Sequence, residues 1–184
     1  SNAFDVGGDT GVEPLFTINN DTPATIESGA FSMNSMFLVP GSAITDYKTA
    51  NVWSDYASRI FGNDVAIQKL TLNALTDRSD LEVKIGDDNL SSVVDLTIKG
   101  SINSYDFMVM RNKMPFLRRL NLSEAHIVEN NYEHYTGYHT EENKFPGYGL
   151  YNCKLITLEL PQGITEIGYY ALASISYLSE VVIP

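Results

Sequence analysis

The stretch Leu155-Ile156-Thr157-Leu158-Glu159-Leu160 carries apolar residues at its first, fourth and sixth positions. Three other stretches share this spacing, and they begin at Val93, Leu117 and Leu178. In chain order, the four starts are 24, 38 and 23 residues apart. Two of these intervals fit one structural period, and the third fits that period plus an insertion of about 15 residues. A period in the low twenties predicts that each copy contributes one strand to a stacked parallel sheet.

This pattern is typical of leucine-rich repeats, so the predicted fold class is α/β: a leucine-rich-repeat solenoid wound as a short right-handed β/α superhelix. Strands are expected near residues 94–98, 118–122, 156–160 and 180–183, side by side, parallel and in that order. Stacking should bury in one core the apolar side chains that a single repeat cannot bury. These side chains are Leu96, Ile98, Leu120, Leu122, Leu158, Leu160, Val181 and Ile183. Solenoids of this kind usually bind other molecules and rarely catalyse reactions.

Composition narrows the classes of partner. Of the 184 residues, 43% are hydrophobic and 19% are charged, which allows a core and argues against wholesale disorder. The net charge of −11 makes nucleic acid and anionic membrane surfaces unsuitable partners, because both require a basic surface. No apolar run has the length of a membrane span, so membrane insertion is not expected. The single cysteine, Cys153, allows no intrachain disulfide, which fits a reducing compartment and equally a secreted repeat protein.

The first third of the chain is predicted to hold a linker and a compact unit. Residues 1–14 are interpreted as the remnant of a removed tag, Ser1-Asn2-Ala3, and a glycine-rich flexible linker. Residues 15–62 are predicted to form a diverged repeat with a capping helix: strands at 15–18 and 37–39, then one helix from about Ser42, its N-cap, to Ile60. The aromatic face of this helix, which includes Trp53, is interpreted as core, with a sugar-stacking platform as the alternative.

Residues 63–184 are predicted to hold a bridge followed by the repeats. In the bridge, residues 67–72 and 81–85 alternate between apolar and polar types and indicate two strands. A helix is predicted to follow Asn103, which can cap it together with Asp106, and to end before Pro115.

The repeat sequences are similar to those of a known family. Residues 155–184, which include Leu158-Glu159-Leu160-Pro161, resemble the BspA-like leucine-rich repeat of Bacteroides-type anaerobic bacteria. Residues 93–127 are similar to the first repeats of such proteins, and Phe37-Leu38-Val39-Pro40-Gly41-Ser42 is similar to the segment that closes an array. The resemblance implies a secreted or cell-surface protein, lipid anchoring included, that binds host or extracellular molecules without shared catalytic residues. Here the closing segment precedes the opening repeats, which departs from the family's order.

The insertion between the second and third repeat strands is the candidate binding segment. Residues 129–151 hold five of the eleven tyrosines and two of the three histidines of the chain. Long loops on rigid scaffolds often carry function, and tyrosine binds well at little entropic cost. The candidate ligand-binding residues are Tyr132, His134, Tyr135, Tyr138 and His139 in the insertion, with Arg119 and Asn121 on the second repeat strand. The alternative is that the aromatic rings only fold the insertion onto the edge of the solenoid.

The sequence offers no catalytic or metal-binding motif. It contains no Gly-x-Ser-x-Gly nucleophile elbow, and Cys153 precedes a repeat strand where a small buried side chain is suitable. His134 and His139 lack the spacing of a zinc protease helix, and Gly137 interrupts any helix between them. No metal, no cofactor and no catalytic residue is therefore expected.

Two functions remain open at this level. The first is a non-catalytic extracellular binding or adhesion module whose partner is a protein or a glycan. The second is a structural spacer or assembly segment of a longer surface protein, and a glycan-acting hydrolase is a distant third. The apolar strand that ends at Pro184 has no closing helix after it. We therefore expect either further repeats in the native chain or self-association through residues 164–184.

Overall fold

The computed structural model describes residues 13–184, and the chain divides into two compact units between Ala66 and Ile67. The sequence placed this boundary between residues 62 and 63. The expected tag remnant and linker at residues 1–14 lie, up to residue 12, outside the described part. Both units combine parallel β-strands with short helices, so the fold class is mixed α/β.

The first unit is built on a three-stranded parallel sheet. Its strands are β1 (Leu15–Thr17), β2 (Met36–Val39) and β3 (Ile60–Gly62), in the order β1-β2-β3. The segments η1 (Gly41–Ala43), α1 (Ile44–Thr49) and η2 (Trp53–Arg59) connect β2 to β3, and α2 (Asn63–Ala66) follows. The two predicted strands are confirmed, and β3 is an addition to them.

The single helix predicted from Ser42 to Ile60 is wrong. The chain leaves the helical conformation at Ala50, whose ψ is 151°, and Val52 then adopts a positive φ of 65°. Ser42 does not cap a helix, because its hydroxyl donates to Asp21 Oδ1 at 3.2 Å instead. The aromatic residues had the spacing of one helical face, but two short helical segments place them in the core.

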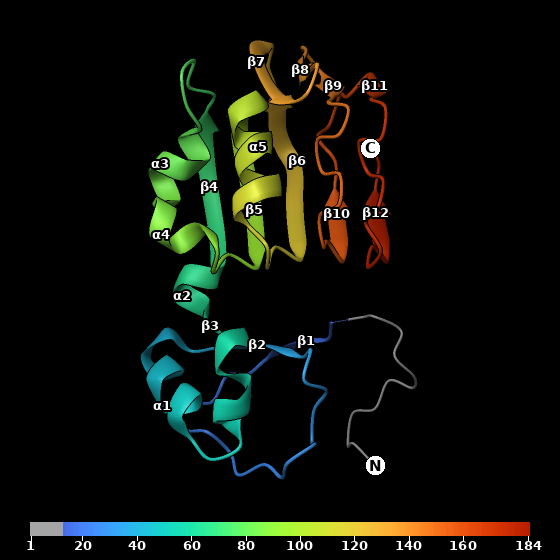
Figure 1. The fold of residues 1–184 in the computed structure, drawn as a ribbon. Helices are drawn as coiled ribbons and strands as arrows, with labels where there is room; N and C mark the ends of the chain where they lie inside the picture. The colour runs from blue at the N-terminus through green and yellow to red at the C-terminus, as the bar shows by residue number, and fades with distance from the viewer. Residues whose placement is uncertain (1–12) are drawn as a thin grey trace. The chain divides into compact units, whose positions relative to one another are not determined.

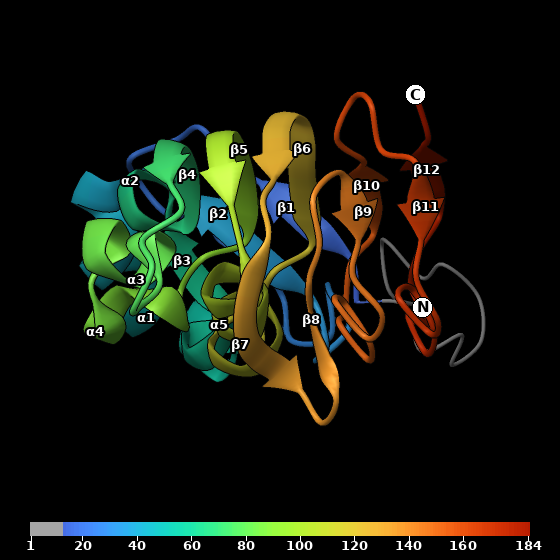
Figure 2. The ribbon, with the colours of Figure 1, turned by 90° about the horizontal axis from the view of Figure 1, so that it is seen from above.

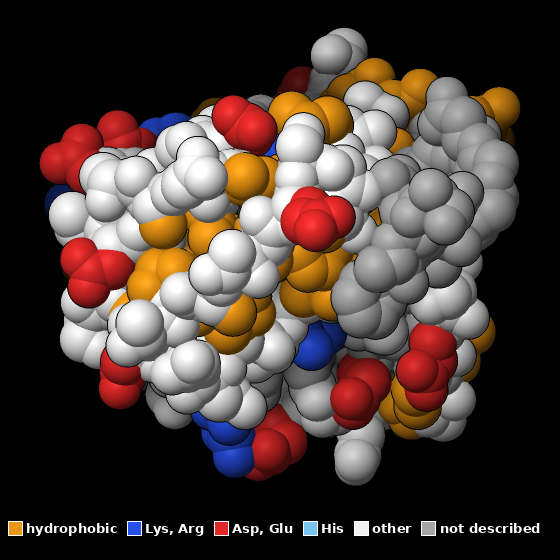
Figure 3. All heavy atoms as spheres, turned by 90° about the horizontal axis from the view of Figure 1, so that it is seen from below, with side chains coloured by type: hydrophobic (Ala, Val, Ile, Leu, Met, Phe, Trp, Pro, Cys, Tyr) orange, Lys and Arg blue, Asp and Glu red, His pale blue; other side chains and the backbone are white. Residues whose placement is uncertain are grey.

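The aromatic core of the first unit is confirmed. Trp53, Tyr47 and Tyr56 are all buried; the rings of Trp53 and Tyr56 pack on Phe37 of β2, and that of Tyr47 packs on Trp53. Trp53 Nε1 donates to the Ala24 carbonyl at 2.7 Å, and the two phenols donate to carbonyls at 2.9 Å. Burial with satisfied polar tips is the expected arrangement for such rings. Figure 3 shows one face of the molecule, on which hydrophobic side chains (orange) are visible among backbone and other side-chain atoms (white).

The second unit is built on a five-stranded parallel sheet in the order β12-β10-β6-β5-β4 (Figures 1 and 2). Its strands are β4 (Ile67–Asn73), β5 (Asp95–Ile102), β6 (Arg119–Ile127), β10 (Thr157–Glu159) and β12 (Glu180–Val182). The predicted order and parallel direction of the four repeat strands are confirmed. The strand predicted at 67–72 also forms, and it extends the sheet beyond β5.

The predicted core of the sheet is confirmed for six residues and fails at its last strand. The six residues from β5, β6 and the β10 segment are 0–2% exposed; they are Leu96, Ile98, Leu120, Leu122, Leu158 and Leu160. Val181 is only half-buried, and Ile183 is 60% exposed, so the prediction for Ile183 is wrong. The reason is topological, because β12 lies at the edge of the sheet and, among residues 13–184, has β10 as its only strand neighbour.

The strand predicted at 81–85 is also wrong, because these residues lie in α3 (Asp80–Ile85), which α4 (Asp87–Leu90) follows. Ser79 caps α3 by accepting a hydrogen bond from the Glu82 amide at 3.1 Å, and Gly86 ends it with a φ of 83°. Leu81 and Ile85 are buried, whereas the side chain of Val83 is 58% exposed. Helix capping therefore outweighs an alternation that is only five residues long.

Helix α5 (Ser104–Lys113) forms as predicted, with the capping box of Asn103 and Asp106. Asp106 Oδ2 accepts from the Asn103 amide at 3.1 Å, and its Oδ1 accepts from Ser79 Oγ at 2.7 Å. The same carboxylate thus joins the start of α5 to the start of α3. Helices α3, α4 and α5 cover one face of the sheet (Figure 2).

The insertion folds as a hairpin on the helix-covered side of the sheet (Figure 2). Strands β7 (Asn130–Tyr135) and β8 (Tyr138–Thr140) pair antiparallel. The short strand β9 (Lys144–Phe145) then pairs in parallel with β11 (Glu166–Ile167) from the next turn of the chain. The insertion is therefore joined to the segment that follows β10.

Candidate functional site

Six tyrosines gather on the surface where the hairpin meets the next two turns of the chain. This tyrosine cluster consists of Tyr135, Tyr138, Tyr148, Tyr151, Tyr169 and Tyr170. The ring of Tyr148 stacks on that of Tyr135 at 4.4 Å and 9°, and on that of Tyr170 at 5.4 Å and 13°. Tyr169 and Tyr170 are 62% and 47% exposed, so the cluster presents aromatic surface to solvent.

The backbone turns beneath the cluster lie against each other. The Tyr148 amide donates to the Tyr169 carbonyl, and the Leu150 amide donates to the Ala171 carbonyl, both at 3.0 Å. Gly168 is required at this approach, because a Cβ atom there would lie 2.5 Å from the Gly147 nitrogen. Close backbone contact therefore fixes the distance between the two turns and brings the rings that they carry into contact.

Arg111 of α5 holds the hairpin and the cluster to the helix. Its guanidinium donates to the carbonyl of His134 and to that of Tyr148, the latter at 3.0 Å, and also contacts His134 Nδ1 at 3.1 Å. The guanidinium carbon lies 5.1 Å from the ring centre of Tyr135, a cation–π geometry. One side chain therefore fixes two segments and one ring of the cluster.

His134, one of the predicted binding residues, lies inside the structure and not on its surface. Its side chain is buried, and its ring lies near Phe107 of α5. Burial, reinforced by the positive charge of Arg111, lowers the pKa of His134 to about 4. The imidazole is therefore neutral at physiological pH, a state that permits its close contact with the guanidinium.

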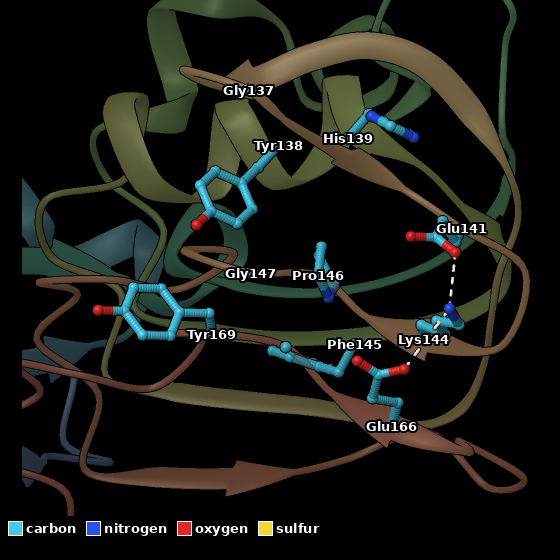
Figure 4. Close-up of a pocket in the computed structure, with 11 residues that line it drawn as sticks. Gly137, Tyr138, His139, Glu141, Lys144, Phe145, Pro146, Gly147, Glu166 and Tyr169 are labelled. Atoms are coloured by element: carbon cyan, nitrogen blue, oxygen red, sulfur yellow. Dashed lines mark hydrogen bonds and ion pairs between the residues drawn. The ribbon is translucent and has the colours of Figure 1, made fainter.

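A pocket of about 310 Å³ opens beside the cluster, between the hairpin and the β9 and β11 strands (Figure 4). Tyr138 and Tyr169 lie toward one end of it, and Glu141, Lys144 and Glu166 lie toward the other. Other lining residues are Gly137, His139, Phe145, Pro146, Gly147 and Gly168. The pocket thus has an aromatic end and a charged end.

The charged end is largely neutralised from within. Lys144 Nζ lies 2.7 Å from Glu141 Oε2 and 3.5 Å from Glu166 Oε2. All three side chains are more than one third exposed, so these ion pairs add little to stability. The hydrogen bond from Lys144 lowers the pKa of Glu141, so this carboxyl group is ionised at neutral pH. The charged end consequently offers both donors and acceptors at a small net charge.

The structure separates the predicted site residues. Tyr135 and Tyr138 belong to the cluster, and His139 lines the pocket. Tyr132 instead stacks on Tyr105 of α5, with ring centres 4.0 Å apart. Arg119 pairs with Asp95, and the Asn121 side chain accepts from Ser123. Both β6 residues alternate with the buried Leu120 and Leu122, so their side chains lie on the opposite face of the strand from the core.

Sequence reasoning missed Tyr169, Tyr170, Arg111, Lys144 and Glu166 as parts of this surface. A signal for Tyr170 exists, because Phe145-Pro146-Gly147-Tyr148-Gly149-Leu150 aligns with Ile167-Gly168-Tyr169-Tyr170-Ala171-Leu172 at an offset of 22 residues, which places Tyr170 opposite Tyr148. That offset is the register of the β9–β11 pair. Arg111 gave no such signal, because its partners lie 23 and 37 residues away on the hairpin and the turn.

Three further features of the described residues bear on other kinds of site. Among residues 13–184, no group of three or more His, Cys, Asp or Glu side chains has the geometry to hold a metal ion. Burial raises the pKa of Cys153 to about 12, so this thiol is protonated and unreactive at neutral pH. None of the helices in the described part has both the length and the apolar character to span a membrane.

Comparison with known proteins adds no assignment: no protein-family model matches the chain, and no curated protein matches it with significance.

Proposed function

We propose that the chain is a non-catalytic extracellular binding module of the leucine-rich-repeat type, secreted or held at the cell surface, with the tyrosine cluster and its pocket as the ligand surface. The repeat reading is supported by register. Leu158 pairs with Val181 at an offset of 23 residues, and Phe145 pairs with Ile167 at an offset of 22. Leu96 pairs with Leu120 at an offset of 24 residues. Near-equal offsets in these three pairs are the expected result of a chain that winds in successive coils, whereas the β4–β5 and β6–β10 pairs have offsets of 28 and 38 residues.

The observation that carries the binding proposal is the exposure of the stacked tyrosines. A ring cluster that served only to fold the insertion would be buried, as Trp53 is in the first unit. Here Tyr169 and Tyr170 remain 62% and 47% exposed beside an open pocket. Tyrosines of this kind give large contact area at low entropic cost, and exposed aromatic groups mark interaction surfaces.

The experiment is a binding screen with a matched pair of variants. The whole protein is tested against immobilised extracellular-matrix proteins and against a glycan array. Tyr169→Ala removes a ring of the cluster, and Tyr132→Ala removes a ring that stacks on α5 outside it. We expect Tyr169→Ala to weaken binding about tenfold and Tyr132→Ala to leave it unchanged. Equal effects of both variants, or no binding in either screen, would contradict the proposal.

A structural spacer is the second candidate, and the exposed edge at β12 favours it. Ile167, Val182 and Ile183 are 41%, 44% and 60% exposed, and β12 is an edge strand. Exposed strand edges with apolar side chains favour pairing with another chain. For a spacer we expect sedimentation to show self-association through residues 164–184, and we expect Val182→Glu to weaken it. A monomer at high concentration would contradict it.

A glycan-acting hydrolase receives less support. Such enzymes need one carboxylic acid with a raised pKa beside a second carboxylate. In the pocket, the hydrogen bond from Lys144 lowers the pKa of Glu141, which is the opposite of what a general acid requires.

A further inference from the structure

The pocket beside the tyrosine cluster is lined by aromatic rings at one end and by charged groups at the other, and this lining fits some classes of ligand better than others. We propose that it binds one ring of a neutral oligosaccharide, with Tyr138 and Tyr169 packing on the apolar face of the sugar and Glu141, Lys144 and Glu166 bonding its hydroxyl groups. This inference rests on the proposed binding function and names its ligand class.

The first argument is size and shape. A volume of about 310 Å³ lies at the small end of the range of about 300–1,000 Å³ that ligand pockets span. That space suits one sugar ring better than a folded protein surface, which would need a broad flat interface. The pocket opens beside Tyr169 and Tyr170, so further sugar units have an aromatic surface to extend over.

The second argument is the position of the aromatic rings. The Tyr138 ring lies over the backbone at Gly147, because a Cβ atom there would stand 2.6 Å from Tyr138 Cδ1. Tyr148 contacts Tyr138 at 4.9 Å and Tyr169 at 5.9 Å between ring centres, so one ring braces both walls. Rings that are already ordered lose little entropy when they bind the C–H face of a sugar.

The third argument is charge, which separates neutral sugars from charged ligands. An anionic sugar would face the carboxylates of Glu141 and Glu166, whereas a cationic ligand would face Lys144. The Lys144 ammonium bridges both carboxylates, so the three groups present donors and acceptors with one excess negative charge, which disfavours an anionic sugar. Hydroxyl groups both donate and accept hydrogen bonds, so a neutral sugar can bond the two carboxylates and the ammonium without adding a charge to the pocket.

The test is calorimetric titration of the full chain with the neutral oligosaccharides that the glycan array selects, compared with the matching sialylated or uronate-containing sugars. We expect neutral sugars to bind, and a trisaccharide to bind more tightly than its monosaccharide. Tyr169→Ala should weaken binding about tenfold, and Tyr169→Phe, which keeps the stacking surface, should retain it. Glu166→Gln should weaken binding less than tenfold, because the amide keeps an acceptor.

Tyr132→Ala is the matched control, and it should bind as the unchanged protein does. Tyr169 is largely exposed, so its replacement does not endanger the fold, and circular dichroism checks this point. Binding of only anionic glycans would overturn the inference. Binding of a matrix protein through the tyrosine cluster, with no neutral sugar bound, would also overturn it while the proposed binding function stands. Absence of every ligand would overturn both.

Discussion

Tyr148 and Tyr170 hold the same place in two successive turns of the chain: their φ angles are 56° and 53°, and their rings stack 5.4 Å apart. Positive φ is uncommon for a residue with a bulky side chain. Each turn therefore holds a residue with a strained backbone at the same point, and the two tyrosine rings stack on each other. The strain is tolerated because each turn is bonded to the other through backbone amides.

The stacking of Tyr148 on Tyr170 should be measurable as a coupling energy. We expect a double-mutant cycle with Tyr148→Leu and Tyr170→Leu to give a coupling of about 0.5–1.5 kcal/mol in the free energy of unfolding. Urea unfolding followed by circular dichroism measures it. A cycle of Tyr148 with Tyr105, which stacks on Tyr132 instead, should give a coupling near zero. Additive effects in the Tyr148–Tyr170 cycle would show that the contact between the two rings does not stabilise the fold.

Replacement of Arg111 should destabilise the second unit. In Arg111→Met the carbonyls of His134 and Tyr148 lose their donor, and we expect a loss of about 2–3 kcal/mol in the free energy of unfolding. Arg78→Met is the control, because Arg78 pairs with Asp77 on the surface, and it should leave stability unchanged. Denaturant unfolding of both variants tests the pair, and equal stabilities would refute the role of Arg111.

The imidazole of His134 should have a pKa far below the usual value for histidine. Its pKa of about 4 lies below the usual 6.5, so between these values the unfolded chain binds more protons than the folded one. His134 therefore contributes stability that is present above pH 6.5 and is lost as the pH falls toward 4. Nuclear magnetic resonance of the imidazole measures the midpoint directly, and in Arg111→Met we expect the midpoint to rise. A midpoint near 6.5 in the unchanged protein would contradict the buried placement.

Gly168 should tolerate no side chain. In Gly168→Ala the added methyl group would overlap the backbone at Gly147, and we expect a loss of about 1–3 kcal/mol with shifted amide resonances at Tyr148 and Tyr170. Gly163→Ala is the comparison, because the added Cβ would meet no atom and the only cost is the positive φ of 79°. We expect it to cost about 1–2 kcal/mol and to leave those resonances in place. Unchanged tyrosine resonances in Gly168→Ala would show that the two turns can separate.

The sequence by itself determined the parallel sheet and the order of its strands. The spacing of Leu117, Leu120 and Leu122, repeated along the chain, requires a buried neighbour on each side, and only stacked parallel strands supply one. The sequence also predicted local structure correctly where several residues favour the same element, as in the capping box of Asn103 and Asp106. The prediction failed where two local signals competed, as in residues 81–85, where the cap at Ser79 outweighed a short alternation.

Only the tertiary structure decided which aromatic residues form a surface. Tyr132 and Tyr135 are three residues apart, yet one stacks on α5 and the other joins the tyrosine cluster. Their separation depends on the path of the hairpin, on the bonds from Arg111 and on the backbone contact at Gly168. The last two join residues that are more than 20 positions apart. A periodic pattern records which side chains must be buried, because burial follows from the local period. It does not record which exposed rings meet, because that depends on contacts between separate turns of the chain.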